Sequence, residues 1–249
     1  MGSFYIPKED ESRPDSQGED SHFVCQEKKR FGLADGVSAW IKKGIDSGEY
    51  SRHLMNNSLV ALNQYYERKG RVKPTRVLKD AYYVTEFPGS STACIVTLND
   101  DDHCLHAANV GDSGFLVFRN RKCIFQSPIQ QHGFNRPYQL AYSSRFGDGA
   151  NVITEIVVSV QSGDTVVAGT DGLLDNMFPS EIEEILIKTL DRDDHQTPED
   201  LAWTIAEYAL HNSVDRYSES PFSRAAHLAG KNRVGGKIDD ITVIVAKII

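Results

Sequence analysis

The chain has 249 residues, 40% of them hydrophobic and 25% charged, and its formal net charge is −8. This composition is that of a globular protein, and no long polar linker divides it, so we expect a single domain over residues 1–249. The acidic balance argues against binding to nucleic acid or to an anionic membrane, and no apolar run is long enough to predict a membrane span.

The first third of the chain predicts a polar arm, two strands and two helices. Residues 1–18 contain several prolines and charges, which favours a surface arm. Apolar runs predict strands at 22–25 and 31–34, and the helical spacing of apolar residues predicts a helix over 52–66. A shorter helix is expected over 76–83.

Strands dominate the middle of the chain. Four short apolar runs separated by turn residues favour an antiparallel meander. These runs are Thr92–Leu98, His103–Ala108, Phe115–Arg119 and Lys122–Gln126. Two further strands are predicted at 152–160 and 165–168.

The last part of the chain predicts two helices and a buried strand. Ser180 and Glu183 have the spacing of a capping box, and Thr197 is expected to cap a second helix. Residues 217–236 are expected to be irregular, whereas the nearly continuous β-branched run over 241–249 suits a buried strand. The alternation of strands and helices indicates an α+β fold with mainly antiparallel pairing.

The cysteines and the N-terminal residues give information about the cellular compartment of the protein. No cysteine has the close spacing of a zinc knuckle or a redox pair, so we expect reduced thiols at Cys25, Cys94, Cys104 and Cys123. The polar N-terminus has no signal-peptide or transit-peptide pattern. The compartment stays open: it is cytoplasmic if Met1 is the native start, and mitochondrial or chloroplast if a presequence has been removed.

Five short segments place an acidic residue at the end of an apolar run, beside a glycine or a second acid. They are Glu19-Asp20, Asp35-Gly36, Gly111-Asp112, Asp171-Gly172 and Asp239-Asp240. A strand end presents a carboxylate at the rim of a sheet, and glycine lets the backbone turn sharply beside it. Carboxylates crowded at such a rim repel one another unless a hard cation such as Mg²⁺ or Mn²⁺ binds between them. A single Asp-Gly pair is also typical of a turn, so the pattern alone leaves turns and a metal site both open.

Other motifs that would indicate a different chemistry are missing from the sequence. The acidic run at 100–102 lacks the glycine and final Glu of a calcium loop, and the odd spacing of His103 and His106 argues against a shared metal. The chain has no GxxxxGK[ST] loop, no GxGxxG and no GxSxG nucleophile elbow. An aspartyl-phosphate mechanism at Asp171 would need a second acid two residues later, where Leu173 stands.

The acidic motifs resemble those of type 2C metal-dependent protein phosphatases, in the same order and over nearly the whole chain. The segments that carry the resemblance are Asp35-Gly36, Gly89-Ser90-Ser91-Thr92-Ala93, Asn109-Val110-Gly111-Asp112-Ser113, Gly169-Thr170-Asp171-Gly172 and Gly236-Lys237-Ile238-Asp239-Asp240. Residues 130–135 and 220–222 are similar to the organellar branch that contains the T-cell activation phosphatase homologue. The resemblance implies an αββα sandwich, in which two antiparallel sheets are flanked by helices.

The resemblance also implies a site for two Mg²⁺ or Mn²⁺ ions and a weaker third. The implied ligands of the two ions are Asp35, which would bridge them, the Gly36 carbonyl, Asp171 and Asp239. Glu19 and Asp20 would act partly through bound water. Asp112 and Asp175 would bind the third ion. The residues implied in catalysis are Asp20, Asp35, Asp171 and Asp239. By the same resemblance, water activated by two metals attacks phosphoserine or phosphothreonine, so we expect a serine/threonine phosphatase that acts as a monomer on phosphoproteins.

Two departures from the family pattern suggest an alternative function. Ser38 and Ala39 stand where the branch has glycines, so this loop is strained if those positions need positive φ. Val37 stands where many members carry a histidine proposed as a general acid. The alternative is a catalytically weak pseudophosphatase that binds phosphoproteins. The family's phosphate-binding arginine has no clear match, and Lys8 and Arg13 are candidates unless they are merely solvated surface residues.

Overall fold

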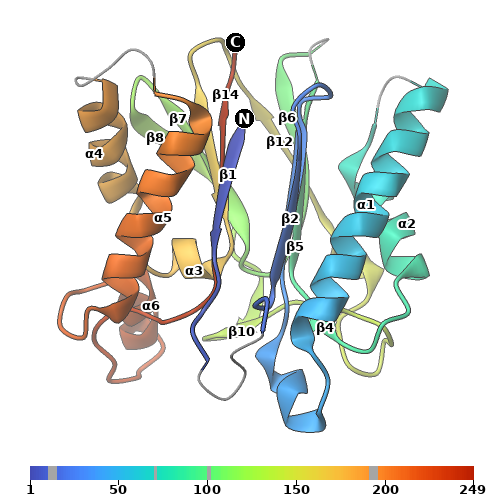
Figure 1. Ribbon diagram of the computed structural model, residues 1–249, viewed down its shortest axis with the longest axis horizontal. Helices are drawn as coiled ribbons and strands as arrows, with labels where there is room; N and C mark the ends of the chain where they lie inside the picture. Colours follow the sequence, from blue (N-terminus) through green and yellow to red (C-terminus); the bar gives the residue numbers. More distant parts are fainter. Residues whose placement is uncertain (11–15, 70–71, 100–101, 191–195) are drawn as a thin grey trace.

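The computed structural model describes residues 1–10, 16–69, 72–99, 102–190 and 196–249. Within these ranges two five-stranded antiparallel sheets pack face to face (Figure 1). The first sheet has the order β1-β14-β13-β7-β8 and the second the order β12-β6-β5-β3-β2. Their strands are β1 (Gly2–Ile6), β14 (Ile241–Lys247), β13 (Thr165–Gly169), β7 (Gly114–Arg119) and β8 (Lys122–Gln126), then β12 (Thr154–Ser159), β6 (Cys104–Val110), β5 (Ala93–Asn99), β3 (Arg30–Asp35) and β2 (Asp20–Cys25).

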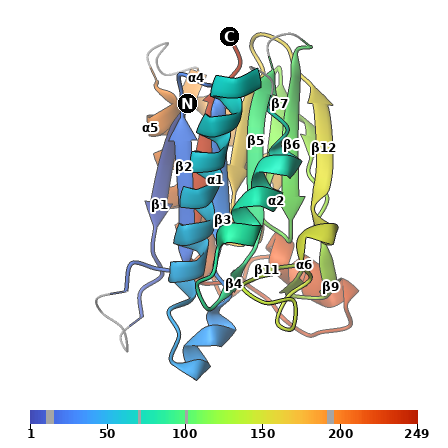
Figure 2. The same ribbon diagram turned by 90° about the vertical axis from the view of Figure 1, so that its right-hand side faces the viewer.

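Helices cover both outer faces of the sheet pair. α1 (Ser47–Lys69) and α2 (Pro74–Val84) lie against the second sheet, and α4 (Pro179–Leu190) and α5 (Pro198–Val214) lie against the first (Figures 1 and 2). The expected αββα sandwich is therefore confirmed. The remaining elements are η1 (Ser38–Lys43), β4 (Ser90–Ser91), β9 (Gln131–Gly133), β10 (Arg136–Pro137), β11 (Leu140–Ala141), η2 (Ala150–Val152), α3 (Asp171–Leu174) and α6 (Pro221–Leu228).

The two ends of the sandwich differ. Both chain termini lie at one end, and α6, β4 and β10 lie at the other (Figures 1 and 2). β2 begins and β3 ends at this second end, where the short helix α3 also follows directly on β13. Strand ends from both sheets therefore meet away from the termini.

Apolar side chains form three layers of core, one between the sheets and one under each pair of helices. The layer between the sheets includes Phe31, Phe115 and Ile244, the layer under α4 and α5 includes Leu116, Ile205 and Val243, and the layer under α1 and α2 includes Leu54, Leu78 and Ile95. Neighbours such as Phe115 and Leu116 belong to different layers because successive side chains of a strand point to opposite faces. Strands buried on both faces explain the nearly continuous apolar runs in the sequence.

Two predictions about strands are wrong. Residues 1–18 are not all a surface arm, because Gly2–Ile6 forms β1 and pairs with β14 at the edge of the first sheet; residues 11–15 lie outside the described part of the chain. The expected meander is also wrong. β5 pairs with β6, and β7 pairs with β8, but the two hairpins belong to opposite sheets.

Two predictions about helices also need correction. Glu183 does not close a capping box, because its carboxylate accepts hydrogen bonds from the Cys123 N–H at 2.8 Å and from Lys122 Nζ at 2.8 Å in β8. The predicted irregular stretch over 217–236 contains α6. Ser220 caps that helix by accepting a hydrogen bond from the Ser223 N–H at 3.0 Å.

Other predictions hold. The strands predicted near 22–25 and 31–34 are β2 and β3, and the buried C-terminal strand is β14. Thr197 caps α5 in a capping box with Asp200. All four cysteines are free thiols. Among the described residues, no helix combines the length and the apolar character needed to cross a membrane.

Candidate metal centre

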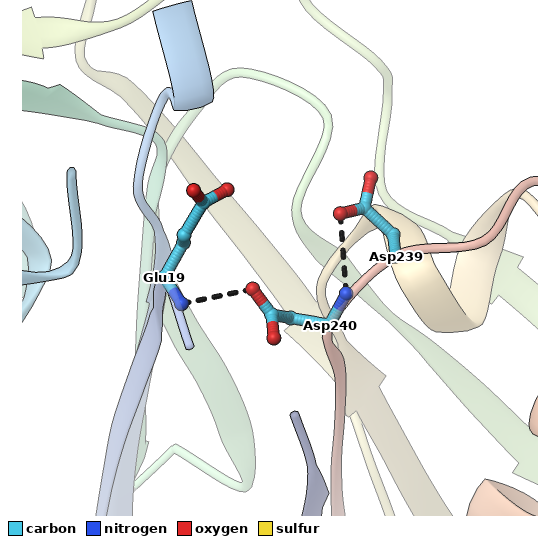
Figure 3. Close-up of side chains that lie close together, drawn as sticks. All are labelled: Glu19, Asp239 and Asp240. Atoms are coloured by element: carbon cyan, nitrogen blue, oxygen red, sulfur yellow. Dashed lines mark hydrogen bonds between the residues drawn. The ribbon is translucent and has the colours of Figure 1, made fainter. Parts of the chain in front are cut away.

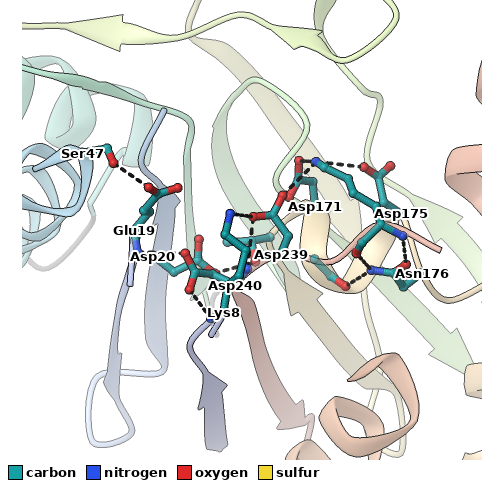
Figure 4. A network of polar contacts seen from close by, with 12 residues as sticks. Lys8, Glu19, Asp20, Ser47, Asp171, Asp175, Asn176, Asp239 and Asp240 are labelled. Atoms are coloured by element: carbon teal, nitrogen blue, oxygen red, sulfur yellow. Dashed lines mark hydrogen bonds and ion pairs between the residues drawn. The ribbon is translucent and has the colours of Figure 1, made fainter. Parts of the chain in front are cut away.

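The acidic side chains singled out in the sequence gather at the end of the sandwich away from the termini (Figure 4). Asp20 and Asp35 are cross-strand neighbours in the second sheet, at the start of β2 and the end of β3. Asp171 begins α3 just after β13 of the first sheet. Asp239 lies just before β14 of the same sheet. The sandwich thus brings together carboxylates that are up to 219 residues apart in the chain, from Asp20 to Asp239.

Residue 36, next to Asp35, must be glycine because backbone atoms of other segments lie too close to it to leave room for a side chain. A Cβ on Gly36 would lie 2.4 Å from the Ser47 carbonyl oxygen and 2.8 Å from the Glu19 carbonyl oxygen. Gly36 also forms a β-bridge with Ser91 and donates its N–H to Glu19 O at 3.0 Å. Close packing, and not a positive φ, therefore explains this glycine.

Thr92 fixes the backbone of Asp35. The Asp35 N–H donates to Thr92 Oγ1 at 3.1 Å, and the Thr92 N–H donates to the Asp35 carbonyl at 2.9 Å. Thr92 Oγ1 is also 2.6 Å from Ser113 Oγ. The motifs around 89–93 and 109–113 therefore support the position of this carboxylate.

Asp20 connects the two sheets. Its Oδ2 accepts hydrogen bonds from Thr170 Oγ1 and Thr242 Oγ1, both at 2.7 Å. Thr170 follows β13 and Thr242 lies in β14, so a residue of the second sheet is held by hydroxyls of the first. Asp20 is only 5% exposed, and its Oδ1 has no hydrogen-bond partner.

A group of three acidic residues lies beside Asp20 (Figure 3). Glu19, Asp239 and Asp240 each offer one carboxylate oxygen, and these oxygens lie within 4.8 Å of one another. Asp240 accepts hydrogen bonds from the Glu19 N–H at 2.8 Å and the Lys8 N–H at 2.7 Å. The sequence reasoning missed Asp240 as a site residue; the second acid of the Asp239-Asp240 pair was the available signal.

Asp175 and Asp112 extend the cluster on the side of α3. Asp175 is the C-cap of α3, and Asp112 follows β6 after Gly111, whose φ is 94°. Burial and the charge of Asp171 raise the pKa of Asp175 to about 7. Burial and the charges of Asp171 and Asp175 hold the pKa of Asp112 well above its usual value. Both residues are therefore electrostatic neighbours of Asp171.

Crowding perturbs the titration of the central carboxylates as well. Burial and the charge of Asp171 raise the pKa of Asp35 well above its usual value, and burial and the charge of Asp240 do the same for Asp20. Burial alone would raise the pKa of Asp239, but Lys237 and Lys8 bring it below its usual value. The cluster therefore carries more negative charge than its surroundings neutralise.

Two lysines reach into the cluster: Lys8, which the sequence offers only as a candidate for binding phosphate, and Lys237, to which the sequence assigns no role. Lys8 Nζ lies 3.2 Å from Asp239 Oδ1, so Lys8 is not simply a solvated surface residue (Figure 4). Arg13, the other candidate, lies outside the described residues. Lys237 Nζ forms ion pairs with Asp171 and with Asp239 Oδ2, the latter at 3.1 Å.

The donor set suits a hard divalent cation. Three buried carboxylate oxygens of the described residues have no hydrogen-bond donor: Asp20 Oδ1, Asp112 Oδ1 and Asp171 Oδ1. Unpaired buried anionic oxygens are costly unless a cation compensates them. Mg²⁺ and Mn²⁺ prefer oxygen ligands of this kind, so the residues present fit such ions. One of these three carboxylates, Asp171, already attracts positive charge, because its other oxygen pairs with Lys237.

The loop after Gly36 is not strained. Among the described residues, positive φ is confined outside glycine to five positions, and neither Ser38 nor Ala39 is one of them. Instead they begin η1, and its Trp40 donates from Nε1 to Ser90 Oγ at 2.6 Å. The hypothesis of a strained loop at these two positions is therefore wrong.

Comparisons with protein families and with known proteins show what this chain is similar to. The family model described as "Stage II sporulation protein E (SpoIIE)" matches residues 47–249. "Probable protein phosphatase 2C 55" of Arabidopsis thaliana is 45% identical over 245 residues, which cover 98% of this chain and 50% of that protein. "Protein phosphatase PTC7 homolog" of Homo sapiens is 36% identical, covering 92% of this chain and 79% of that protein. The chain thus spans about half the length of the plant relative.

Solved structures show the same architecture. The X-ray structure of the photosystem II phosphatase PBCP superposes with a TM-score of 0.88 at 32% identity, covering 100% of this chain and 98% of that one. The catalytic domain of the serine threonine protein phosphatase PstP, in complex with 2 manganese ions, superposes with a TM-score of 0.66 at 15% identity, covering 100% and 97%. The second likeness concerns the fold alone.

Proposed function

Since the chain belongs to the type 2C (PPM) family of metal-dependent protein phosphatases, in its PTC7 branch, we propose that it hydrolyses phosphoserine and phosphothreonine in proteins at the acidic cluster. The observation that carries the proposal is the convergence of Asp20, Asp35, Asp171 and Asp239 from both sheets. Bare carboxylates at this density repel one another, so the arrangement makes sense as a place for divalent cations.

We assign the ligands by their position in the cluster. Asp35 and the Gly36 carbonyl would hold one Mg²⁺ or Mn²⁺, and Asp35, Asp171 and Asp239 would hold a second. Glu19 and Asp20 would contact bound water. Asp112 and Asp175 lie further along the cluster and would hold a third ion more weakly. Divalent ions bound there would supply Lewis acidity and a nucleophilic water near neutral pH.

The chain's own residues position the reaction. The Asp20 carboxylate is held by two hydroxyl donors and the Asp35 backbone is held by Thr92, so both residues are positioned before the substrate binds. Lys8 lies at the rim with a side chain that is 26% exposed. We assign its ammonium to the phosphoryl oxygens of the substrate, in place of the family's arginine.

The pseudophosphatase alternative was based on a strained loop at Ser38 and Ala39. Neither residue has a positive φ, so the loop gives no support to that alternative. Val37 still offers no proton to the leaving group. The alternative predicts binding of phosphopeptides without turnover at any concentration of divalent ion.

The test is release of phosphate from phosphoserine and phosphothreonine peptides as Mn²⁺ or Mg²⁺ is titrated. We expect activity that EDTA abolishes, and Asp171→Asn should reduce it by at least about 100-fold, because even outer-shell partners of a metal typically cost 10–100-fold. Asp80→Asn on the surface of α2 is the matched control and should leave turnover unchanged. Metal-independent turnover, or full activity in Asp171→Asn, would refute the assignment.

A further inference from the structure

Lys237 is a buried cation in the middle of the acidic cluster. Its ammonium pairs with Asp171, with Asp239 Oδ2 at 3.1 Å and with Asp175 Oδ2 at 3.3 Å, and its side chain is only 14% exposed. A fixed positive charge therefore lies between the carboxylates assigned to one divalent ion.

The backbone of Lys237 is held in place, so only its side chain is free to move. The Lys237 N–H donates to Asn176 Oδ1 at 2.8 Å, and Asn176 Nδ2 donates to the Lys237 carbonyl at 2.8 Å. On the preceding residue, a Cβ on Gly236 would lie 2.1 Å from the Asn212 carbonyl oxygen. This close packing and the two hydrogen bonds hold the segment before β14 in place.

A second resting place for the ammonium lies nearby. The Phe222 ring centroid is 5.6 Å from Lys237 Nζ, and an aromatic face attracts cations. Phe222 is itself fixed to the cluster, because its N–H donates to the Asp175 carbonyl at 3.0 Å. Rotation of the Lys237 side chain would bring its ammonium closer to this ring, which the Arg233 guanidinium also contacts at 4.7 Å.

An ammonium and a divalent ion cannot share the same carboxylate oxygens. Like charges a few ångströms apart repel strongly where burial lowers the effective dielectric constant. Lys237 Nζ holds Oδ2 of both Asp171 and Asp239, so an ion bound there, or on the unpaired Asp171 Oδ1, would lie within a few ångströms of the ammonium and repel it. Breaking these ion pairs subtracts from the free energy of ion binding.

We propose that Lys237 is a tethered competitor of the divalent ion: its ammonium occupies Asp171 and Asp239 when the ion is absent, withdraws when it binds, and so weakens binding at this position. The inference rests on the metal centre of the proposed function. It assigns Lys237 a role in setting how much free divalent ion the protein needs. Lys8 contacts only one of these carboxylates, so its effect should be smaller.

The first test is Mn²⁺ titration by calorimetry, without substrate, of the parent chain and of Lys237→Met. We expect the variant to bind one ion at least about tenfold more tightly, because methionine keeps the apolar stem and removes the competing charge. Lys188→Met removes an exposed lysine that pairs with Glu184 on α4, and should change nothing. Unchanged or weaker affinity in Lys237→Met would overturn the proposal.

The second test needs no variant. Acetylation of lysines in the parent chain is followed by mass spectrometry with and without Mn²⁺, with Lys188 as the reference amine. We expect the reactivity of Lys237 to rise when the ion binds, since its ion pairs are broken; unchanged protection would overturn the proposal. Neither readout uses turnover, so a chain that passes both tests but hydrolyses no phosphopeptide would refute only the proposed phosphatase function.

Discussion

Single backbone positions decide whether the carboxylates can approach one another. Gly36 lies so close to the Ser47 and Glu19 carbonyls that any side chain would displace the end of β3. Asp35 would move with it, because the two residues are adjacent. The candidate metal centre thus depends on the absence of a side chain at Gly36 as well as on the acidic residues themselves.

We therefore predict that Gly36→Ala lowers both activity and stability. A Cβ at 2.4 Å from a carbonyl oxygen forces the backbone to shift, and such overpacking typically costs about 1–3 kcal/mol. Phosphatase assays with denaturant melts measure both effects. Gly133→Ala is the control, since a Cβ there meets nothing within 4 Å; equal behaviour of the two variants would contradict the packing argument.

Restoring the glycines of the branch should not improve the enzyme. Ser38 and Ala39 lie in η1 without positive φ, so Ser38→Gly with Ala39→Gly relieves no strain. We expect kcat/KM to stay within about threefold and stability to fall by roughly 0.5–1 kcal/mol per glycine. A tenfold rise in kcat/KM would show that the native residues limit activity.

At the level of elements, the site depends on a contact between the two sheets. Thr242 in β14 and Thr170 after β13 both donate to Asp20 Oδ2 in β2. These hydroxyls are buried, so their loss leaves a carboxylate oxygen without its donors. The contact fixes the relative position of strands that belong to different sheets.

We predict that Thr242→Val destabilises the fold by about 1–3 kcal/mol, because the isosteric side chain removes only the donor. Denaturant melts of Thr242→Val, Thr170→Val and the double variant form a cycle, and the two effects should couple through Asp20. Thr97→Val in β5, whose hydroxyl makes one long contact at 3.4 Å, should cost less. Strict additivity would mean that Asp20 does not connect the two hydroxyls.

Local sequence signals identified most elements but not their partners. Alternating and continuous apolar runs marked β2, β3 and β14, and Thr197 marked the start of α5. The meander failed because the short connection at 111–113 crosses between sheets, and no local signal specifies that. β1 was missed because its pairing with β14 joins opposite ends of the chain.

The same limit applies to the site. The acids stood out because each follows or precedes an apolar run beside glycine or another acid, and the family resemblance supplied their roles. Lys237 and Asp240 were not assigned, and Lys8 was only a candidate for binding phosphate, because most of their partners lie more than 60 residues away in the chain. The places of Lys8 and Asp240 follow from the packing of the first sheet against β2, and that of Lys237 from the approach of the segment before β14 to α3.

For the whole molecule, the crowded carboxylates should make stability depend on pH when ions are absent. Burial raises the pKa of Asp175 from 3.8 to about 7, and those of Asp20, Asp35, Asp112 and Asp171 in the same direction. The folded protein then holds more protons than the unfolded chain in this range. Its stability should therefore fall as pH rises from 3.8 to about 7, by on the order of a few kcal/mol.

Thermal melts in EDTA at pH 5 and pH 8 measure this dependence. We expect a lower Tm at pH 8, and a larger gain in Tm from Mn²⁺ at pH 8 than at pH 5, because the ions bind ionised carboxylates. Asp175→Asn should flatten the pH dependence. A metal-free Tm that rises between these two pH values would contradict the assignment of charge in the cluster.

The placement of the termini has a practical consequence. Met1 and Ile249 lie at the end of the sandwich opposite the acidic cluster (Figures 1 and 2), about one strand length away. An affinity tag, a fluorescent protein or a surface linker attached at residue 1 or residue 249 would lie away from the acidic cluster. Immobilised protein and fusion reporters can therefore be built without covering the acidic cluster.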